Sequence, residues 1–82
     1  MNKNYEKLDA MILDAIFRGD RNPMYDKDVF VEAWRIGEET GRKRMRVING
    51  RLTALRKLEK IKYLKKAEAP KGKTGWYFAI AT

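Results

Sequence analysis

The 82-residue chain is long enough for one small domain and too short for two, so we expect a single thin core and no enclosed catalytic cleft. It has no cysteine and no histidine, which excludes thiol nucleophiles, imidazole bases, disulfides and the usual zinc sites, so we expect neither an enzyme nor a bound cofactor. The net charge of +8 lies almost entirely in residues 42–66, which carry +10 and suggest a polyanionic partner, while a solvated basic face is the plainer alternative.

The first predicted element is an amphipathic helix from about Asn4 to Arg18, ended by Gly19 and Asp20. Its apolar side chains recur at helical spacing and are Leu8, Met11, Ile12, Ala15 and Ile16. Charged residues interrupt them, so this stretch is neither a signal peptide nor a membrane span, and we expect a soluble cytoplasmic protein with no membrane partner. We interpret Asp9 and Asp14 as solubilising charges on the exposed side rather than as a catalytic pair.

A turn at residues 21–23 separates this helix from a second one. Met24 and Tyr25 are expected to form a very short extended segment, because the chain must swing back over the first helix. Asp26 is a suitable N-cap. The apolar stripe that we expect to face the core contains Phe30, Ala33, Trp34 and Gly37. Residues 37–41, with a glycine at each end, are expected to form a C-cap and a turn.

The third predicted helix, residues 42–60, has two opposite faces. At about 100° per residue, one face collects Ile48, Leu52, Leu55 and Glu59, with Leu58 at its edge. The other face, which we expect to be exposed, collects Arg46, Asn49, Gly50, Thr53, Arg56, Lys57 and Lys60. The sequence therefore predicts a core helix with a basic outward face.

The last predicted element is an antiparallel hairpin. Residues 63–67 have moderate strand propensity and residues 76–81 a strong one. The loop between them, residues 68–75, is rich in proline and glycine and carries Lys71 and Lys73. Alternation along the second strand places Trp76, Phe78 and Ile80 on one face, which we expect to cover the helices, and Tyr77 and Ala79 on the other.

This order of elements resembles a winged helix-turn-helix domain. The stretch INGRLTALRKLEKIKYLKK is similar to the recognition helix and following strand of small winged-helix regulators of prokaryotes or phages. Leu52, Leu55 and Leu58 match its leucines and Tyr63-Leu64 its hydrophobic exit pair, whereas Lys62 stands where that family usually has glycine. The resemblance implies an α+β fold in which three helices are followed by a two-stranded β-hairpin wing, with residues 1–82 as a single winged-helix domain.

The resemblance also implies sequence-specific binding of double-stranded DNA, with helix 42–60 in the major groove and wing 68–75 on the backbone or in the adjacent groove. We expect base contacts from Arg46, Asn49, Thr53 and Arg56, because arginine pairs with guanine, asparagine with adenine, and threonine with either kind of edge. Phosphate or wing contacts are expected from six further residues, namely Arg42, Lys43, Lys57, Lys60, Lys71 and Lys73.

Gly50 falls on the outward face, although glycine costs about 1 kcal/mol relative to alanine inside a helix. Three accounts stay open. It permits close approach of the helix to DNA or to another helix, it marks a kink where a first turn from Arg42 joins the main helix, or it is a neutral choice.

A small transcriptional regulator is thus the leading hypothesis from the sequence. The alternative is a winged-helix protein-protein interaction module whose basic helix docks on an acidic partner, since domains of one fold serve different functions. RNA binding by the same surface is a further hypothesis, but no array of stacking aromatic residues accompanies the basic residues. The oligomeric state stays open from the sequence; a weak homodimer paired through the first helix is one hypothesis, because no further helix for a large dimer interface follows the hairpin.

Overall fold

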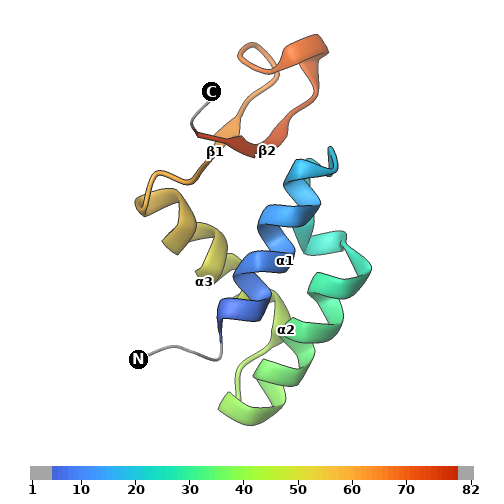
Figure 1. The fold of residues 1–82 in the computed structure, drawn as a ribbon, viewed down its shortest axis with the longest axis vertical. Helices are drawn as coiled ribbons and strands as arrows, with labels where there is room; N and C mark the ends of the chain where they lie inside the picture. Colours follow the sequence, from blue (N-terminus) through green and yellow to red (C-terminus); the bar gives the residue numbers. More distant parts are fainter. Residues whose placement is uncertain (1–4, 80–82) are drawn as a thin grey trace.

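The computed structural model of the chain describes residues 5–79 and contains three helices followed by a two-stranded antiparallel β-hairpin (Figure 1). This α+β arrangement is the predicted fold class and is consistent with a winged-helix layout. The elements in chain order are α1 (Glu6–Phe17), the short 3-10 helix η2 (Pro23–Tyr25), α2 (Lys27–Thr40), α3 (Arg44–Lys57), β1 (Ile61–Leu64), the 3-10 turn η3 (Pro70–Gly72) and β2 (Gly75–Phe78). Within this described part, no helix is long and apolar enough to cross a membrane.

The core lies between the three helices, and the hairpin covers one end of it. The apolar stripe predicted for α1 is confirmed, since Leu8, Ile12, Ala15 and Ile16 are buried and Met11 is partly buried. The other buried apolar side chains are Val29, Ala33 and Ile36 of α2, Val47, Ile48, Leu52 and Leu55 of α3, and Ile61 of β1.

The segment before α2 differs from the sequence prediction. Met24 and Tyr25 belong to η2 and not to an extended segment. Pro23 sits at the start of η2, where its fixed φ favours a helical turn and its missing N–H costs nothing. The N-cap prediction is confirmed, because the Asp26 carboxylate accepts hydrogen bonds from the N–H groups of Asp28 and Val29, both at 3.2 Å.

The C-cap predicted within residues 37–41 is confirmed at Gly41, whose left-handed conformation (φ +74°) caps α2, but the helix continues through Gly37 to Thr40. Gly37 is a packing residue instead, because a side chain there would collide with the carbonyl oxygen of Arg42 in the turn to α3. Trp34 is 50% exposed rather than in the core. The buried face of α2 is rotated from the predicted stripe and includes Val29, Glu32, Ala33, Ile36 and Gly37, and Phe30 is only half-buried.

Helix α3 has the predicted buried face but is shorter than residues 42–60. Ile48, Leu52 and Leu55 are buried as predicted, and Val47 joins them. Leu58 is 63% exposed and Glu59 is also exposed, because the helix ends at Lys57 and the chain turns away. Glu59 adopts the left-handed conformation (φ +60°) that allows this turn. Lys62 is a strand residue in β1, so the missing glycine at that position is not needed for the helix end.

The antiparallel hairpin is confirmed, with strands at slightly different positions from those predicted. Ile61 pairs with Phe78, Lys62 with Tyr77, Tyr63 with Trp76, and Leu64 with Gly75. Trp76 packs against the core as expected, whereas Phe78, which is 38% exposed, covers the helices only in part. Tyr77 lies on the other face, as predicted from the alternation. Ile80 lies outside the described residues.

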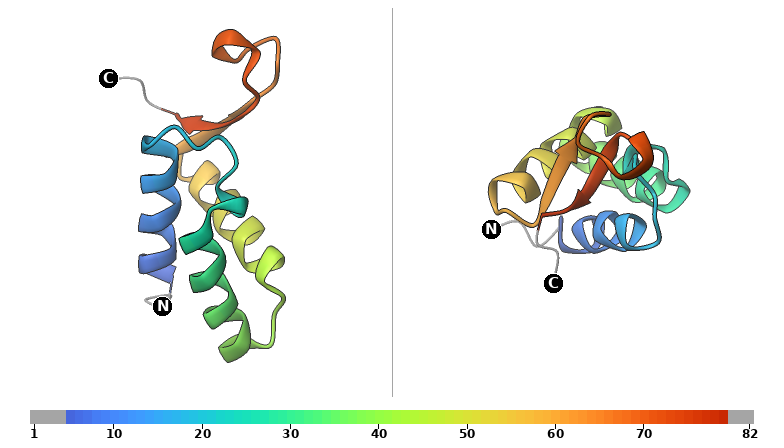
Figure 2. Two further views of the ribbon diagram at one scale, coloured as in Figure 1. Left: turned by 90° about the vertical axis from the view of Figure 1, so that its right-hand side faces the viewer. Right: turned by 90° about the horizontal axis from the view of Figure 1, so that it is seen from above.

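Contacts with the end of α1 fix the position of the hairpin. The backbone N–H of Trp76 donates to the backbone carbonyl oxygen of Arg21 at 2.8 Å. Gly75, at φ +144°, has no side chain to block this approach. The Arg21 guanidinium donates to the Ile16 carbonyl oxygen at 2.6 Å and stacks 4.0 Å from the centre of the Tyr77 ring. The hairpin therefore lies across the ends of the helices, and the loop joining its strands projects on the side of α3 (Figure 2).

Candidate nucleic-acid interface

The outward face of α3 is exposed as predicted. Arg46, Asn49, Gly50, Thr53, Arg56 and Lys57 all lie on the surface, as do Arg42 and Lys43 before the helix and Lys60 after it. The first turn of α3 contains no acidic residue, and no side chain caps its N-terminus. This end of the helix therefore carries the positive end of the helix dipole together with several cationic side chains.

Four of the predicted contact residues surround one open depression beside the N-terminal half of α3. Its volume is about 820 Å³, and the residues Arg42, Lys43, Arg46 and Asn49 line it together with Gly41 and Met45. Residues predicted for phosphate contact and for base contact thus meet in one place. A phosphate-holding rim beside a base-reading side chain is the arrangement that a helix in a groove needs.

A second open groove, of about 480 Å³, separates α3 from the hairpin. Asn49 and Thr53 line it from α3, Arg21, Asn22 and Met24 from the region around η2, and Tyr63, Thr74 and Trp76 from the hairpin. Asn49 belongs to both depressions, so the predicted surface continues from the N-terminus of α3 to the hairpin.

The sequence did not indicate three exposed residues that line this groove as contact residues, namely Asn22, Tyr63 and Thr74. Tyr63 is 49% exposed and stacks edge-on against Trp76 with a centroid distance of 5.3 Å. Side chains two apart on a strand lie on the same face, so Tyr63 shares the face of the buried Ile61. The sequence prediction missed this because it began the strand at residue 63. Asn22 and Thr74 line the same groove as α3 next to the tertiary contact between Arg21 and Trp76, which no local pattern indicates.

The predicted base-contact arginines have no carboxylate partner in the described part of the chain. Among residues 5–79, no carboxylate oxygen lies within 4.0 Å of a charged nitrogen of Arg46 or Arg56, and the same is true of Lys57 and Lys60. Their charges therefore face solvent without internal neutralisation. Cations at this density attract a polyanion and repel one another.

Arg51 is the exception on α3, because it binds Asp9 of α1. Its Nε donates to Asp9 Oδ1 at 2.9 Å and its Nη2 to Asp9 Oδ2 at 2.7 Å, and its guanidinium lies 4.6 Å from the centre of the Tyr5 ring. The hydrogen bond to Asp9 raises the pKa of Arg51 against the opposing effect of burial. The interpretation of Asp9 as a solubilising charge is therefore wrong, since it fixes α3 to α1. Asp14 is exposed as expected and binds Arg18 at 2.8 Å.

Arg44, at the start of α3, is held by aromatic rings. Its guanidinium carbon lies 4.3 Å from the centre of the Phe30 ring and 5.2 Å from that of Trp34. The cations of α3 therefore divide into two that the fold uses, Arg44 and Arg51, and an outward set that it does not.

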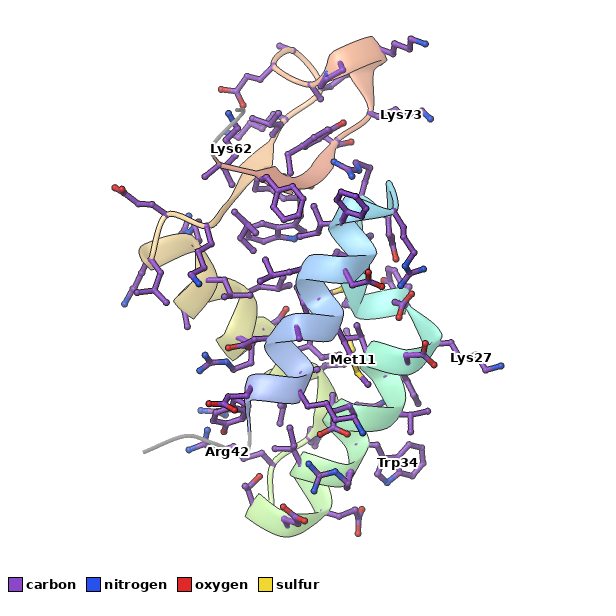
Figure 3. All side chains as sticks on the ribbon, in the orientation of Figure 1. Met11, Lys27, Trp34, Arg42, Lys62 and Lys73 are labelled. Atoms are coloured by element: carbon purple, nitrogen blue, oxygen red, sulfur yellow. The ribbon has the colours of Figure 1, made fainter. Side chains whose placement is uncertain are left out.

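The hairpin places Lys71 and Lys73 away from both depressions. Both are exposed, Lys71 in η3 and Lys73 directly after it, and the Tyr77 hydroxyl donates to the Lys73 carbonyl oxygen at 2.7 Å. Lys73 and Arg42 lie near opposite ends of the molecule, whose longest axis is 39 Å (Figure 3). The predicted contact residues thus form one group on and around α3 and a separate pair on the hairpin.

The basic surface does not extend to the N-terminus of α2. Asp26 already accepts from its first N–H groups, and Asp28 is exposed beside it. Two carboxylates at this position repel phosphate, so the candidate interface consists of α3, the turn before it and the hairpin. In the described part of the chain, no group of three or more acidic side chains could hold a metal ion.

The chain matches no protein-family model, no curated protein and no solved structure. Its function therefore has to follow from its own residues. The outward face of α3 combines arginine, asparagine and threonine, which can hydrogen-bond to base edges, with flanking lysines that can bind phosphates.

Proposed function

We propose that the chain binds double-stranded DNA in a sequence-specific manner, as a small winged-helix transcriptional regulator. Helix α3 enters the major groove, and the loop of the hairpin contacts the backbone or the adjacent groove. The observation that supports this most strongly is the outward set of α3 cations, which have no carboxylate partner among the described residues.

The shape of the basic surface favours a duplex over a single strand. An α-helix fits the major groove of B-DNA, which is about 12 Å wide. Single-stranded nucleic acid is instead held by exposed aromatic rings along a basic channel. Here the outward residues of α3 are not aromatic, and Tyr63 is the one exposed large aromatic residue in the groove beside the hairpin.

Each base-contact residue has a separate role. Arg46 and Arg56 can each form two hydrogen bonds to a guanine, and Asn49 can form two to an adenine. Thr53 lies beside the groove to the hairpin and can contact a thymine methyl group or a base edge. Arg42, Lys43, Lys57 and Lys60 bind phosphates on the two sides of the helix, which sets the register of α3 in the groove.

The proposal predicts strongly salt-dependent binding. If six to eight side chains contact phosphates, the logarithm of affinity falls with the logarithm of salt concentration with a slope of about −5 to −7. Fluorescence anisotropy of a labelled random duplex, titrated with protein at several salt concentrations, measures this slope. A slope close to zero contradicts the proposal.

The alternative, docking of the basic helix on an acidic protein, predicts a different outcome. A folded protein that does not shift random duplex DNA in a gel at low salt favours an acidic protein partner. If DNA is bound, selection of binding sites from random oligonucleotides then gives the recognised sequence. Enrichment of no sequence limits the function to non-specific DNA binding.

A further inference from the structure

A stripe of side chains on α2 lies outside the core and holds none of the residues proposed to contact DNA, although Trp34 and Glu38 line a pocket with Arg42 and Lys43 at its C-terminal end. Lys27, Val31, Trp34 and Glu38 are all exposed and follow one another at spacings of four, three and four residues, which places them on one side of the helix. Val31 is 62% exposed and Trp34 is 50% exposed. Lys27 and Trp34 point away from the molecule on the same side of α2 (Figure 3).

Trp34 is held in place although half of it is exposed. Its indole N–H donates to Glu38 Oε2 at 3.2 Å, and its ring meets that of Phe30 edge-on, with a centroid distance of 5.9 Å. The Arg44 guanidinium lies 5.2 Å from the centre of the Trp34 ring. An ordered aromatic side chain loses little conformational entropy on binding, which makes it a good anchor for a partner.

The order of residues in the stripe is self-complementary. Lys27 and Glu38 lie at equal distances in sequence from the midpoint between Glu32 and Ala33, and so do Val31 and Trp34. A two-fold axis through this midpoint pairs α2 with an antiparallel copy of itself. It places Lys27 opposite Glu38 of the second copy and Val31 opposite Trp34 of the second copy, so both ends attract and the apolar residues meet in the middle.

We propose that a second copy of the chain pairs with this stripe, forming a symmetric dimer through antiparallel α2 helices. Charge complementarity identifies the occupant, because the stripe carries a cation at one end and an anion at the other. Helix α1, where the sequence suggested pairing, has one strongly exposed large apolar side chain among its described residues, Phe17, at its C-terminal end. It therefore has no comparable stripe.

The contact is small, so the dimer is weak. A 14-residue helix is about 21 Å long, and two of them bury less than the ~1,200 Å² of a standard stable interface. We expect a dissociation constant between about 10 µM and 1 mM. Sedimentation equilibrium of the full chain without DNA measures it, so this result is independent of DNA binding. A wild-type chain that is monomeric at about 1 mM overturns the proposal and leaves the stripe to another partner.

Charge reversal tests the pairing of Lys27 with Glu38. Lys27→Glu places Glu opposite Glu38 twice in the dimer, and Glu38→Lys places Lys opposite Lys27 twice. Each variant alone is expected to dimerise roughly tenfold more weakly than the wild type. Lys27→Glu puts a negative charge at the N-terminus of α2, and Glu38→Lys puts a positive charge near its C-terminus. The helix dipole favours both charges, so the fold is expected to be retained, and circular dichroism checks this.

Mixing the two variants separates this arrangement from any other. In a dimer of one Lys27→Glu chain and one Glu38→Lys chain, both charged pairs attract again, and affinity rises well above that of either variant alone. The chain with both substitutions also regains affinity, and any remaining loss measures the Trp34 hydrogen bond that Glu38→Lys removes. Lys62→Glu, a change of the same charge on the hairpin, leaves the dissociation constant unchanged. A mixture that associates no better than its separate components overturns the proposal.

Discussion

Helices α2 and α3 are both 14 residues long and pack against each other, but their charges are arranged differently. Helix α2 has two basic and four acidic residues. Arg35 binds two of the acidic residues within the same helix, Glu32 at 2.6 Å and Glu39 at 2.8 Å. Much of the charge on α2 is thus neutralised locally, as is usual for a helix that is stabilised by its own side chains.

Helix α3 has five basic residues and no acidic one. Arg51 binds Asp9 and Arg44 stacks on aromatic rings, whereas Arg46, Arg56 and Lys57 have no carboxylate within 4.0 Å in the described residues. Repulsion among these charges lowers the stability of the folded chain. The difference between the helices supports the proposal that the outward face of α3 binds a polyanion.

The largest expected effect comes from reversing charge on the outward face of α3. Arg46→Glu combined with Arg56→Glu is expected to weaken DNA binding at least ~30-fold, because each arginine–base contact contributes about 1–3 kcal/mol. Both residues are exposed, so the fold is retained. Fluorescence anisotropy measures the affinity, and circular dichroism checks the fold.

The matched control for this variant is Lys27→Glu combined with Lys62→Glu. It makes the same change in net charge with exposed residues at the start of α2 and on the outer face of the hairpin. We expect less than about a fivefold loss of affinity, since charges remote from the duplex are screened by salt. Equal losses in the two double variants contradict a specific α3 interface and leave only a net-charge effect.

A second test separates the cation that the fold uses from the outward ones. Asp9→Ala leaves the partly buried Arg51 without its partner and is expected to destabilise the protein by about 2 kcal/mol. Urea denaturation measures the loss. Arg51→Met and the double variant complete a cycle that isolates the coupling between the two side chains. DNA affinity under conditions where the protein is fully folded should stay the same, and a coupling near zero contradicts the role of the pair.

The charges within α2 give a smaller, pH-dependent effect. The hydrogen bond from Arg35 lowers the pKa of Glu32, against the opposing effect of its burial. Because the pKa is lower in the folded than in the unfolded chain, the contribution to stability is present at neutral pH and is lost as the pH falls below the ordinary value of 4.5. Glu32→Gln should therefore cost roughly 1 kcal/mol at neutral pH.

The sign of this effect is checked by urea denaturation of wild type and Glu32→Gln at neutral pH and at about pH 3. The difference in unfolding free energy should shrink at the lower pH, because the unfolded chain then takes up a proton at Glu32 more readily than the folded chain, in which the pKa of Glu32 is lowered. A difference that stays constant with pH shows that the variant acts through packing and not through charge.

The smallest effect concerns Gly50 on the outward face of α3. The helix runs without interruption through Gly50. The explanation in which Gly50 marks a kink between a first turn and the main helix is therefore wrong. A methyl group there would meet nothing within 4 Å, so Gly50→Ala should raise the unfolding free energy by about 0.5–1 kcal/mol. DNA binding decides between the remaining accounts, since a large loss of affinity indicates close approach and no loss indicates a neutral choice. A stability that does not rise contradicts the prediction.

The parts of the fold that depend on local periodicity could be predicted from the sequence. The core residues of α1 and α3 recur at helical spacing, and Asp26 is an N-cap by residue type and position. The face of α2 could not be predicted in this way. Its stripe of Phe30 and Trp34 is apolar but lies beside the core, whereas Glu32, a charged residue, is buried because Arg35 binds it.

The candidate site shows the same limit. The exposed face of α3 follows from its helical pattern, so Arg46, Asn49, Thr53 and Arg56 are on the surface as predicted. The roles of Asp9 and Tyr63 depend on contacts between distant parts of the chain. Asp9 meets Arg51 across 42 positions, and the groove that Tyr63 lines forms where the hairpin meets the segment around Arg21. Patterns within one element contain no information about such contacts.

The comparison of the two helices is tested most directly by amide chemical shifts. The chain, labelled with nitrogen-15, is titrated with a duplex of about 12 base pairs, which at ~3.4 Å per base pair matches the 39 Å long axis of one copy. If α3 binds DNA through its outward face, the largest shift changes occur at Arg46, Asn49, Thr53 and Arg56 and in the hairpin loop, with small changes along the exposed side of α2. Changes concentrated on α2, or no changes at low salt, contradict DNA binding by α3.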